Sequence, residues 1–183
     1  MNLNFNFTRT LQAAGVLLEY EKGRRMSTMR LLKLLYVADR EALAEMGRPI
    51  TGDQALAMKQ GPVLSRTYDL IRGQSARSGE WDHFIHKDGY GIELVADPGR
   101  GDLSKGEVAK LLEVADRYRN LDDWELSEET HKFEEWKKNY PGNNEAKPIP
   151  WEEALAALGR TELAEAIERD ESDRRFFDQL FGG

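Results

Sequence analysis

Residues 28–46 read TMRLLKLLYVADREALAEM. Apolar side chains recur on nearly every side of the helix that the spacing predicts, and a helix that is apolar all round is a buried one. Thr28 is suited to opening this helix, and Gly47-Arg48-Pro49 ends it, because Pro cannot continue a helix. The sequence therefore predicts a buried central helix on which the rest of the chain packs.

The segments on both sides of this helix also have mostly helical patterns. Apolar residues recur at i, i+3, i+4 spacing, and polar capping residues precede them. Ser104-Lys105-Gly106-Glu107 is a capping box, and Pro62 after Gly61 favours the start of a helix. We expect further helices at about residues 8–22, 54–59, 63–71 and 151–158. Three more are expected to begin at residue 105, after Ser127 (to about residue 138), and at Thr161, the last of which continues through the tail.

One segment, residues 81–95, has the period of a strand. Tyr90, Ile92 and Leu94 alternate with polar residues, and Asp88-Gly89 before them is a strong hairpin turn signal. Residues 73–79 before it are a polar loop. The predicted fold class is therefore mainly α with minor β: a compact helical domain with one β-hairpin around residues 81–95 and C-terminal helices, 150–183, packed on it.

The composition indicates a single-domain protein and excludes several kinds of site and partner. The 183 residues suit a single domain spanning 1–183, and the absence of Cys excludes disulfides, thiolate metal sites and Cys nucleophiles. The net charge is −7, but residues 1–80 carry 12 basic and 8 acidic residues (+4), whereas residues 81–183 carry 14 and 25 (−11). A chain with this balance is not a general nucleic-acid binder. With no signal peptide and no membrane span in sight, we expect a cytoplasmic protein.

No catalytic, metal or cofactor motif stands out. His83 and His86 lie three apart in a predicted strand and would point to opposite faces, so they make a poor metal pair. The chain has no phosphate-binding loop and no nucleophile elbow. Asp39 follows a nearly all-apolar stretch, which favours a buried polar tie over a general base. We therefore predict no catalytic residue, no metal and no cofactor.

Five pieces of sequence, taken in order, resemble one family. They are Lys33-Leu34-Leu35-Tyr36-Val37-Ala38-Asp39-Arg40, Gly47 to Gly52, Ala57 and Gly61-Pro62-Val63 with Tyr68-Asp69, Leu103-Ser104 at the start of a helix, and Leu126 with Thr130-His131 and Trp136. Together they resemble the Panacea, or SocA-like, antitoxin domain, which is often described as phage-associated. The resemblance is strongest over residues 10–140. Its motif residues, with a role in the fold or in binding a toxin, are Lys33, Leu34, Tyr36, Asp39, Gly61, Pro62, Val63, Tyr68, His131 and Trp136.

The resemblance implies an antitoxin that neutralises a cognate toxin, encoded by an adjacent gene, through direct protein–protein contact. Three alternatives stay open at this point. A proteolytic adaptor or regulatory scaffold would dock through the tail, 174–183, with its Phe176-Phe177. A DNA-binding autorepressor would present Arg24, Arg25, Arg30 and Lys33 on one face, and a hydrolase would pair Asp39 with His131. Homodimer formation is likewise open.

Overall fold

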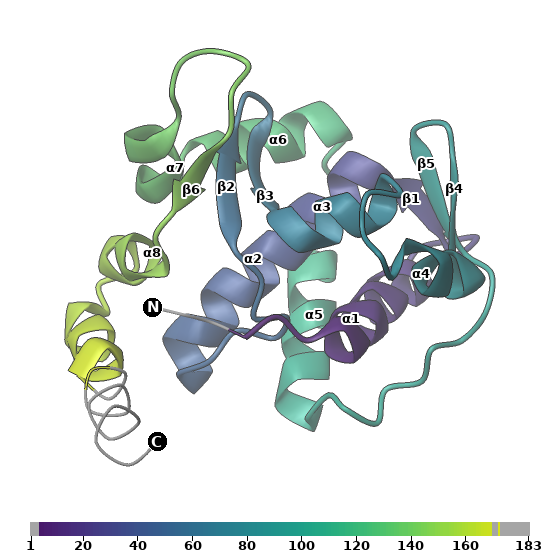
Figure 1. Cartoon of the computed structure of the whole chain (residues 1–183), viewed down its shortest axis with the longest axis horizontal. Helices are drawn as coiled ribbons and strands as arrows, with labels where there is room; N and C mark the ends of the chain where they lie inside the picture. Colours follow the sequence, from purple (N-terminus) through teal and green to yellow (C-terminus); the bar gives the residue numbers. More distant parts are fainter. Residues whose placement is uncertain (1–3, 170–171, 173–183) are drawn as a thin grey trace.

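The computed structural model describes residues 4–169 and 172, and in it helix α2 (Thr28–Met46) runs through the middle of the molecule (Figure 1). Its flanking residues define its ends. The Ser27 side chain accepts a hydrogen bond from the backbone N–H of Arg30, and Gly47 closes the helix in the left-handed conformation with φ 74°. Fourteen of the helix's residues are buried, so the predicted central helix is confirmed.

Helices surround α2 on several sides. Helices α1 (Phe7–Tyr20) and α5 (Lys105–Tyr118) pack against it and against each other. The predicted capping box of Ser104 and Glu107 opens α5. The remaining helices are α3 (Ser65–Ile71), α4 (Ser78–Phe84), α6 (Asp123–His131), α7 (Glu134–Asn139), α8 (Trp151–Ala157) and a last helical segment at residues 161–169.

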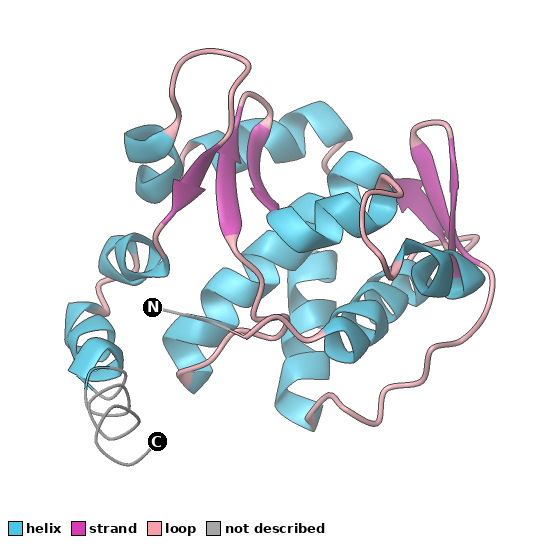
Figure 2. Cartoon of the chain, in the orientation of Figure 1, coloured by secondary structure: helices cyan, strands magenta, loops and turns pink. Residues whose placement is uncertain are grey.

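The strands form two small antiparallel sheets that lie apart from each other (Figure 2). One sheet has the order β1-β5-β4, built from β1 (Arg25–Ser27), β4 (Ile85–Asp88) and β5 (Gly91–Leu94). The other has the order β3-β2-β6, built from β2 (Ala55–Met58), β3 (Gly61–Leu64) and β6 (Lys147–Ile149). The fold is thus mainly α with minor β, as predicted.

Several local predictions need correction. The hairpin at Asp88-Gly89 is present, but residues 78–84 before it are helical rather than loop and strand. Residues 54–59, predicted as a helix, hold strand β2, and the helix predicted from Val63 begins at Ser65 after β3. The structure therefore contains a second hairpin, β2–β3, that the sequence analysis missed. The helix predicted after Ser127 is two helices, α6 and α7, and the first is capped by Asp122.

The buried apolar side chains form one continuous cluster that extends from Phe7 to Ala164. Trp151 at the start of α8 belongs to it, so the chain after residue 150 packs on the rest at least through this helix. The single-domain prediction for 1–183 stays a prediction, and Phe176-Phe177 lie outside the described residues. None of the described helices has the length and apolar character needed to cross a membrane.

Candidate functional site

The turn of the β2–β3 hairpin is held by side chains from distant parts of the chain. Lys33 Nζ, from α2, donates a hydrogen bond of 2.7 Å to the carbonyl oxygen of Pro62. Trp136 Nε1, from α7, donates one of 2.9 Å to the carbonyl oxygen of Met58. Both donors and Pro62 are motif residues, so part of the motif serves to fix this hairpin against the helices.

Gly61 lets the turn approach these helices closely. Its φ is 96°, and a Cβ built there would lie 2.5 Å from Thr130 Oγ1 and 3.1 Å from Lys33 Nζ. The hydroxyl of Ser127, also on α6, donates a 2.8 Å hydrogen bond to the carbonyl oxygen of Gln60. The site requires glycine for two reasons, because a side chain would be strained and would also collide with neighbours.

Lys33 is a buried amine without a carboxylate partner in the described part of the chain. Its side chain is 1% exposed, and burial lowers its pKa from 10.5 to about 7. The Pro62 carbonyl takes one of its three donor hydrogens. A lysine in this setting is poised between its charged and neutral forms near neutral pH.

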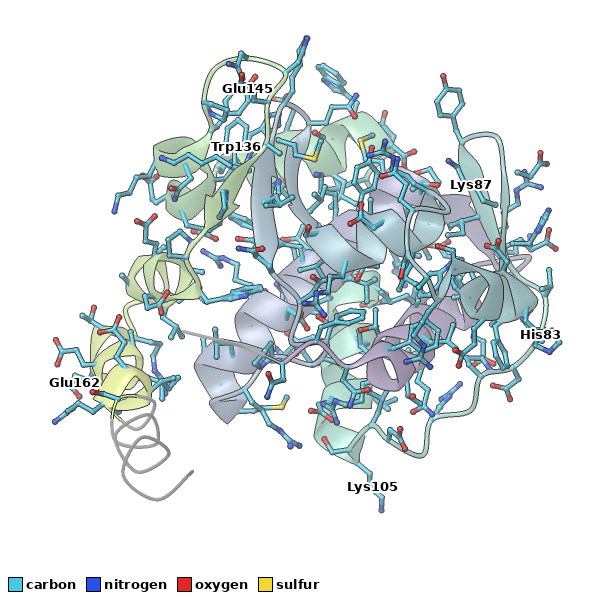
Figure 3. The ribbon with its side chains drawn as sticks, viewed as in Figure 1. His83, Lys87, Lys105, Trp136, Glu145 and Glu162 are labelled. Carbon is cyan, nitrogen blue, oxygen red and sulfur yellow. The ribbon has the colours of Figure 1, made fainter. Side chains whose placement is uncertain are left out.

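His131 and Trp136 form a stacked aromatic pair beside the same hairpin. Their ring centroids lie 4.1 Å apart, and Trp136 stacks in turn on Tyr140 at 4.9 Å (Trp136 is labelled in Figure 3). His131 Nδ1 lies 3.3 Å from a carboxylate oxygen of Glu128, whereas its Nε2 is buried without a hydrogen-bond partner among the described residues. The contacts of His131 are thus its ring packing on Trp136 and the short-range contact of Nδ1 with Glu128 in the same helix.

A second cluster joins α2 to α7 and α8. Tyr36 is fully buried, stacks on Trp151 at 5.7 Å, and donates a 2.9 Å hydrogen bond to Glu135 Oε1. Arg40 donates to the same carboxylate at 2.5 and 3.2 Å and lies over the Phe133 ring at 4.2 Å. Burial, followed by the charge of Glu135, holds the pKa of Tyr36 well above its usual range. This network fastens the C-terminal helices to the central one.

Glu135 is a site residue that was not predicted from the sequence. It lies among charged residues and looked like part of a solvated face, yet it is 1% exposed. The signal that could have found it is on α2: Tyr36 and Arg40 are four residues apart, so they share one face of a buried helix. A buried guanidinium requires a carboxylate partner, and the partner had to come from another element.

Asp39 ties the end of α2 to the loop that follows. Its Oδ1 accepts hydrogen bonds of 2.9 Å from the backbone N–H groups of Ile50 and Thr51, and its Oδ2 accepts one from the Thr51 hydroxyl. Burial raises the pKa of Asp39 to about 7, against the lowering effect of these donors. No hydrogen bond or ion pair among the described residues joins Asp39 to His131, so the structure does not assemble the pair that the hydrolase alternative requires.

The basic face that the autorepressor alternative requires is also not formed. Lys33 and Arg30 are buried, and Arg30 donates to the carbonyl oxygens of Tyr118 and Leu121 at 2.9 Å each. Only Arg24 and Arg25, the other two of the four, are exposed. DNA phosphates could therefore contact only Arg24 and Arg25 among the four residues that this alternative requires.

A pocket of about 330 Å³ opens where α2, the β2–β3 hairpin, α3 and the β4–β5 turn meet. Three motif residues line it: Lys33, Val63 and Tyr68. The other lining side chains are apolar, polar or basic, and no described Asp or Glu is among them. These other residues are Thr28, Met29, Leu32, Met58, Gln60, Arg72, Lys87, Gly89 and Tyr90.

Among the described residues no group of three or more His, Asp or Glu side chains could hold a metal ion. His83 lies in helix α4 and His86 in strand β4, so the two are not in one strand as predicted. Leu34, the last of the ten motif residues, is fully buried in the core.

Comparison with known proteins gives one match. The family model described as antitoxin SocA-like, Panacea domain, matches residues 31–137, which is more than half of the chain. No curated protein and no solved structure matches. The matched region begins in α2 and ends in α7, so it contains every motif residue discussed above.

Proposed function

Because the chain belongs to the family of SocA-like antitoxins with a Panacea domain, we propose that it is the antitoxin of a toxin–antitoxin pair and neutralises a cognate toxin by direct binding. The match over residues 31–137 carries this proposal. The toxin would be the product of an adjacent gene, and both proteins would act in the cytoplasm. The role is one of binding rather than catalysis.

The placement of the motif supports a binding role. Eight of its ten residues are buried, and Tyr68 and His131 are partly buried. Their contacts fix the hairpin, the α2–α7 network and the loop after α2, which are tasks of the fold. A shared interior of this kind leaves the surface free to differ between relatives, so partner choice would rest on exposed residues outside the motif.

The acidic second half of the chain supplies one such surface. Trp124 on α6 is 68% exposed, and Asp122, Asp123, Glu125 and Glu128 lie within four residues of it. Aromatic side chains are common anchors of protein interfaces, and complementary charge mainly speeds encounter and selects the partner. We propose that this surface meets a basic part of the toxin.

Co-expression with each adjacent gene tests the proposal. The toxic product should arrest growth alone, and this chain should restore growth and co-purify with it. Repeating the rescue in a host without its ATP-dependent proteases separates direct neutralisation from the adaptor alternative. Rescue that persists supports direct binding, whereas rescue that requires the protease assigns the adaptor role. Absence of rescue with every adjacent gene would refute the antitoxin proposal.

A further inference from the structure

We propose that the pocket between α2, the β2–β3 hairpin, α3 and the β4–β5 turn binds an acidic segment of the partner protein, with a carboxylate set beside an apolar side chain. The proposal rests on the proposed function, since it names where and how the partner would dock. The proposed occupant is a peptide carboxylate. The pocket is basic, so its charge is opposite to that of the acidic surface around Trp124.

The charge of the residues that line the pocket favours an anionic occupant. Arg72, just after α3, and Lys87, in β4, line the pocket as cations, and the buried amine of Lys33 lines it from α2. No described acidic residue lines the pocket with them. Elsewhere on the described chain many cations have carboxylate partners, such as Arg77 with Glu80 at 2.7 Å. Neither of the two pocket cations, nor the amine of Lys33, forms an ion pair in the part of the chain that the structure describes. In a protein with a net charge of −7, such a group of unpaired cations attracts an anion from outside.

One residue that lines the pocket has a buried hydroxyl group without a hydrogen-bond partner among the described residues. This residue is Thr28, in the first turn of α2. The backbone N–H of Thr28 is already used, because it donates to the carbonyl oxygen of Tyr90 at 2.9 Å. A buried hydroxyl without a partner is costly, and a carboxylate oxygen bound beside it would satisfy it. The positive end of the helix dipole favours the same anion.

The apolar part of the pocket lining favours a peptide over a small inorganic anion. Met29, Met58 and Val63 also line the pocket, and Tyr90, another lining residue, is 94% exposed. Arg72 lies over the Tyr68 ring at 4.8 Å, so its guanidinium is held by an aromatic face instead of an acid. Methionine and tyrosine side chains adapt to apolar partners. Bare phosphate would leave these surfaces uncovered, whereas a peptide with an apolar side chain beside its carboxylate would cover them.

Charge reversal at the rim tests the proposal. Lys87 is exposed, and its side chain makes no hydrogen bond or ion pair with any residue that the structure describes, so Lys87→Glu should fold normally. Arg72→Glu is the second variant. The matched control is Lys105→Glu, because Lys105 is an exposed lysine on a different side of the molecule (Figure 3) and an acid at the start of α5 suits the helix dipole. Thermal melts establish that all three variants are folded.

Binding is measured for two ligands by calorimetry on the full chain. One is the adjacent-gene toxin, and the other is a short capped peptide of alternating Glu and Phe, with its Gln counterpart as the uncharged control. We expect Lys87→Glu and Arg72→Glu each to weaken binding about tenfold or more, with Lys105→Glu unchanged and the Gln peptide not bound.

The outcomes separate this inference from the proposed function. If the toxin binds and the two rim variants bind it as tightly as the unaltered chain, the pocket proposal is wrong while the antitoxin role stands. If the toxin does not bind but the Glu peptide does, with the rim variants weakened, the pocket stands and the antitoxin role is wrong. If neither ligand binds the unaltered chain, both are refuted.

Discussion

Replacing Lys33 with Met should change how the stability of the protein depends on pH. The methionine side chain is close in length to the lysine stem, so it fills the same space under the β2–β3 turn but carries no amine. Lys33 has a pKa lowered by burial to about 7, whereas in the unfolded chain it returns to its usual 10.5. Between these values the unfolded state binds a proton that the folded state does not. The free energy of unfolding therefore rises with pH through this window.

The magnitude follows from the size of the pKa shift. Each pKa unit corresponds to about 1.36 kcal/mol, so the full linkage from the lowered pKa of Lys33 is about 5 kcal/mol. Between pH 7 and about pH 9.5 the unaltered chain should gain about 3 kcal/mol of stability from this group, which the variant lacks. Near neutral pH the variant should be the more stable protein, since it loses only one hydrogen bond of about 1 kcal/mol, to Pro62.

Urea denaturation of both proteins at a series of pH values measures this difference. Other titrating groups contribute alike to both proteins, so the difference between the two curves isolates Lys33. Exposed Lys105→Met is the control and should give a curve parallel to that of the unaltered chain. Parallel curves for Lys33→Met would refute the assignment of Lys33 as a buried, easily deprotonated amine, as would a difference of opposite slope.

Three substitutions test the other contacts. Tyr36→Ala should lower the free energy of unfolding by about 3–5 kcal/mol, because the ring is fully buried; an unchanged thermal melt would contradict its placement. Glu135→Gln should cost about 3–5 kcal/mol by leaving the Arg40 guanidinium buried without its carboxylate, and a double-mutant cycle with Arg40→Met should show strong coupling, so additive effects would exclude the pair. Gly61→Ala should cost more than about 1–2 kcal/mol, from positive φ together with the collision with Thr130; a chemical melt within error of the unaltered chain would refute the close approach.

The sequence sufficed to predict the elements whose signals are local. The central helix, the capping box at Ser104, the hairpin at Asp88-Gly89 and the helix from Trp151 are all confirmed, because periodicity, caps and turn residues specify each of them within a few residues. The motif residues of the candidate site came from the resemblance, and the family is confirmed by the match over residues 31–137, which is shorter than the predicted 10–140.

The parts that were missed depend on partners far away in the chain. Strand β2 reads Ala-Leu-Ala-Met, which favours a helix, and Pro62 looks like a helix start. Pro62 is instead tolerated in β3 because β3 is an edge strand of its sheet. What holds this hairpin is Lys33, Ser127 and Trp136, and no local pattern reveals them. The buried pair of Arg40 and Glu135 escaped prediction for the same reason.

The way the β2–β3 turn is fastened has a consequence for synthesis on the ribosome. The turn depends on hydrogen bonds that reach 29 residues back to Lys33 and 67 and 78 residues forward to Ser127 and Trp136. Contacts of such long sequence separation form only after the whole intervening chain has been made. Until Trp136 has left the ribosome, its hydrogen bond to the carbonyl oxygen of Met58 cannot form. The binding-competent shape would thus appear late in translation, and a messenger cut short before that codon would produce a chain with no finished hairpin.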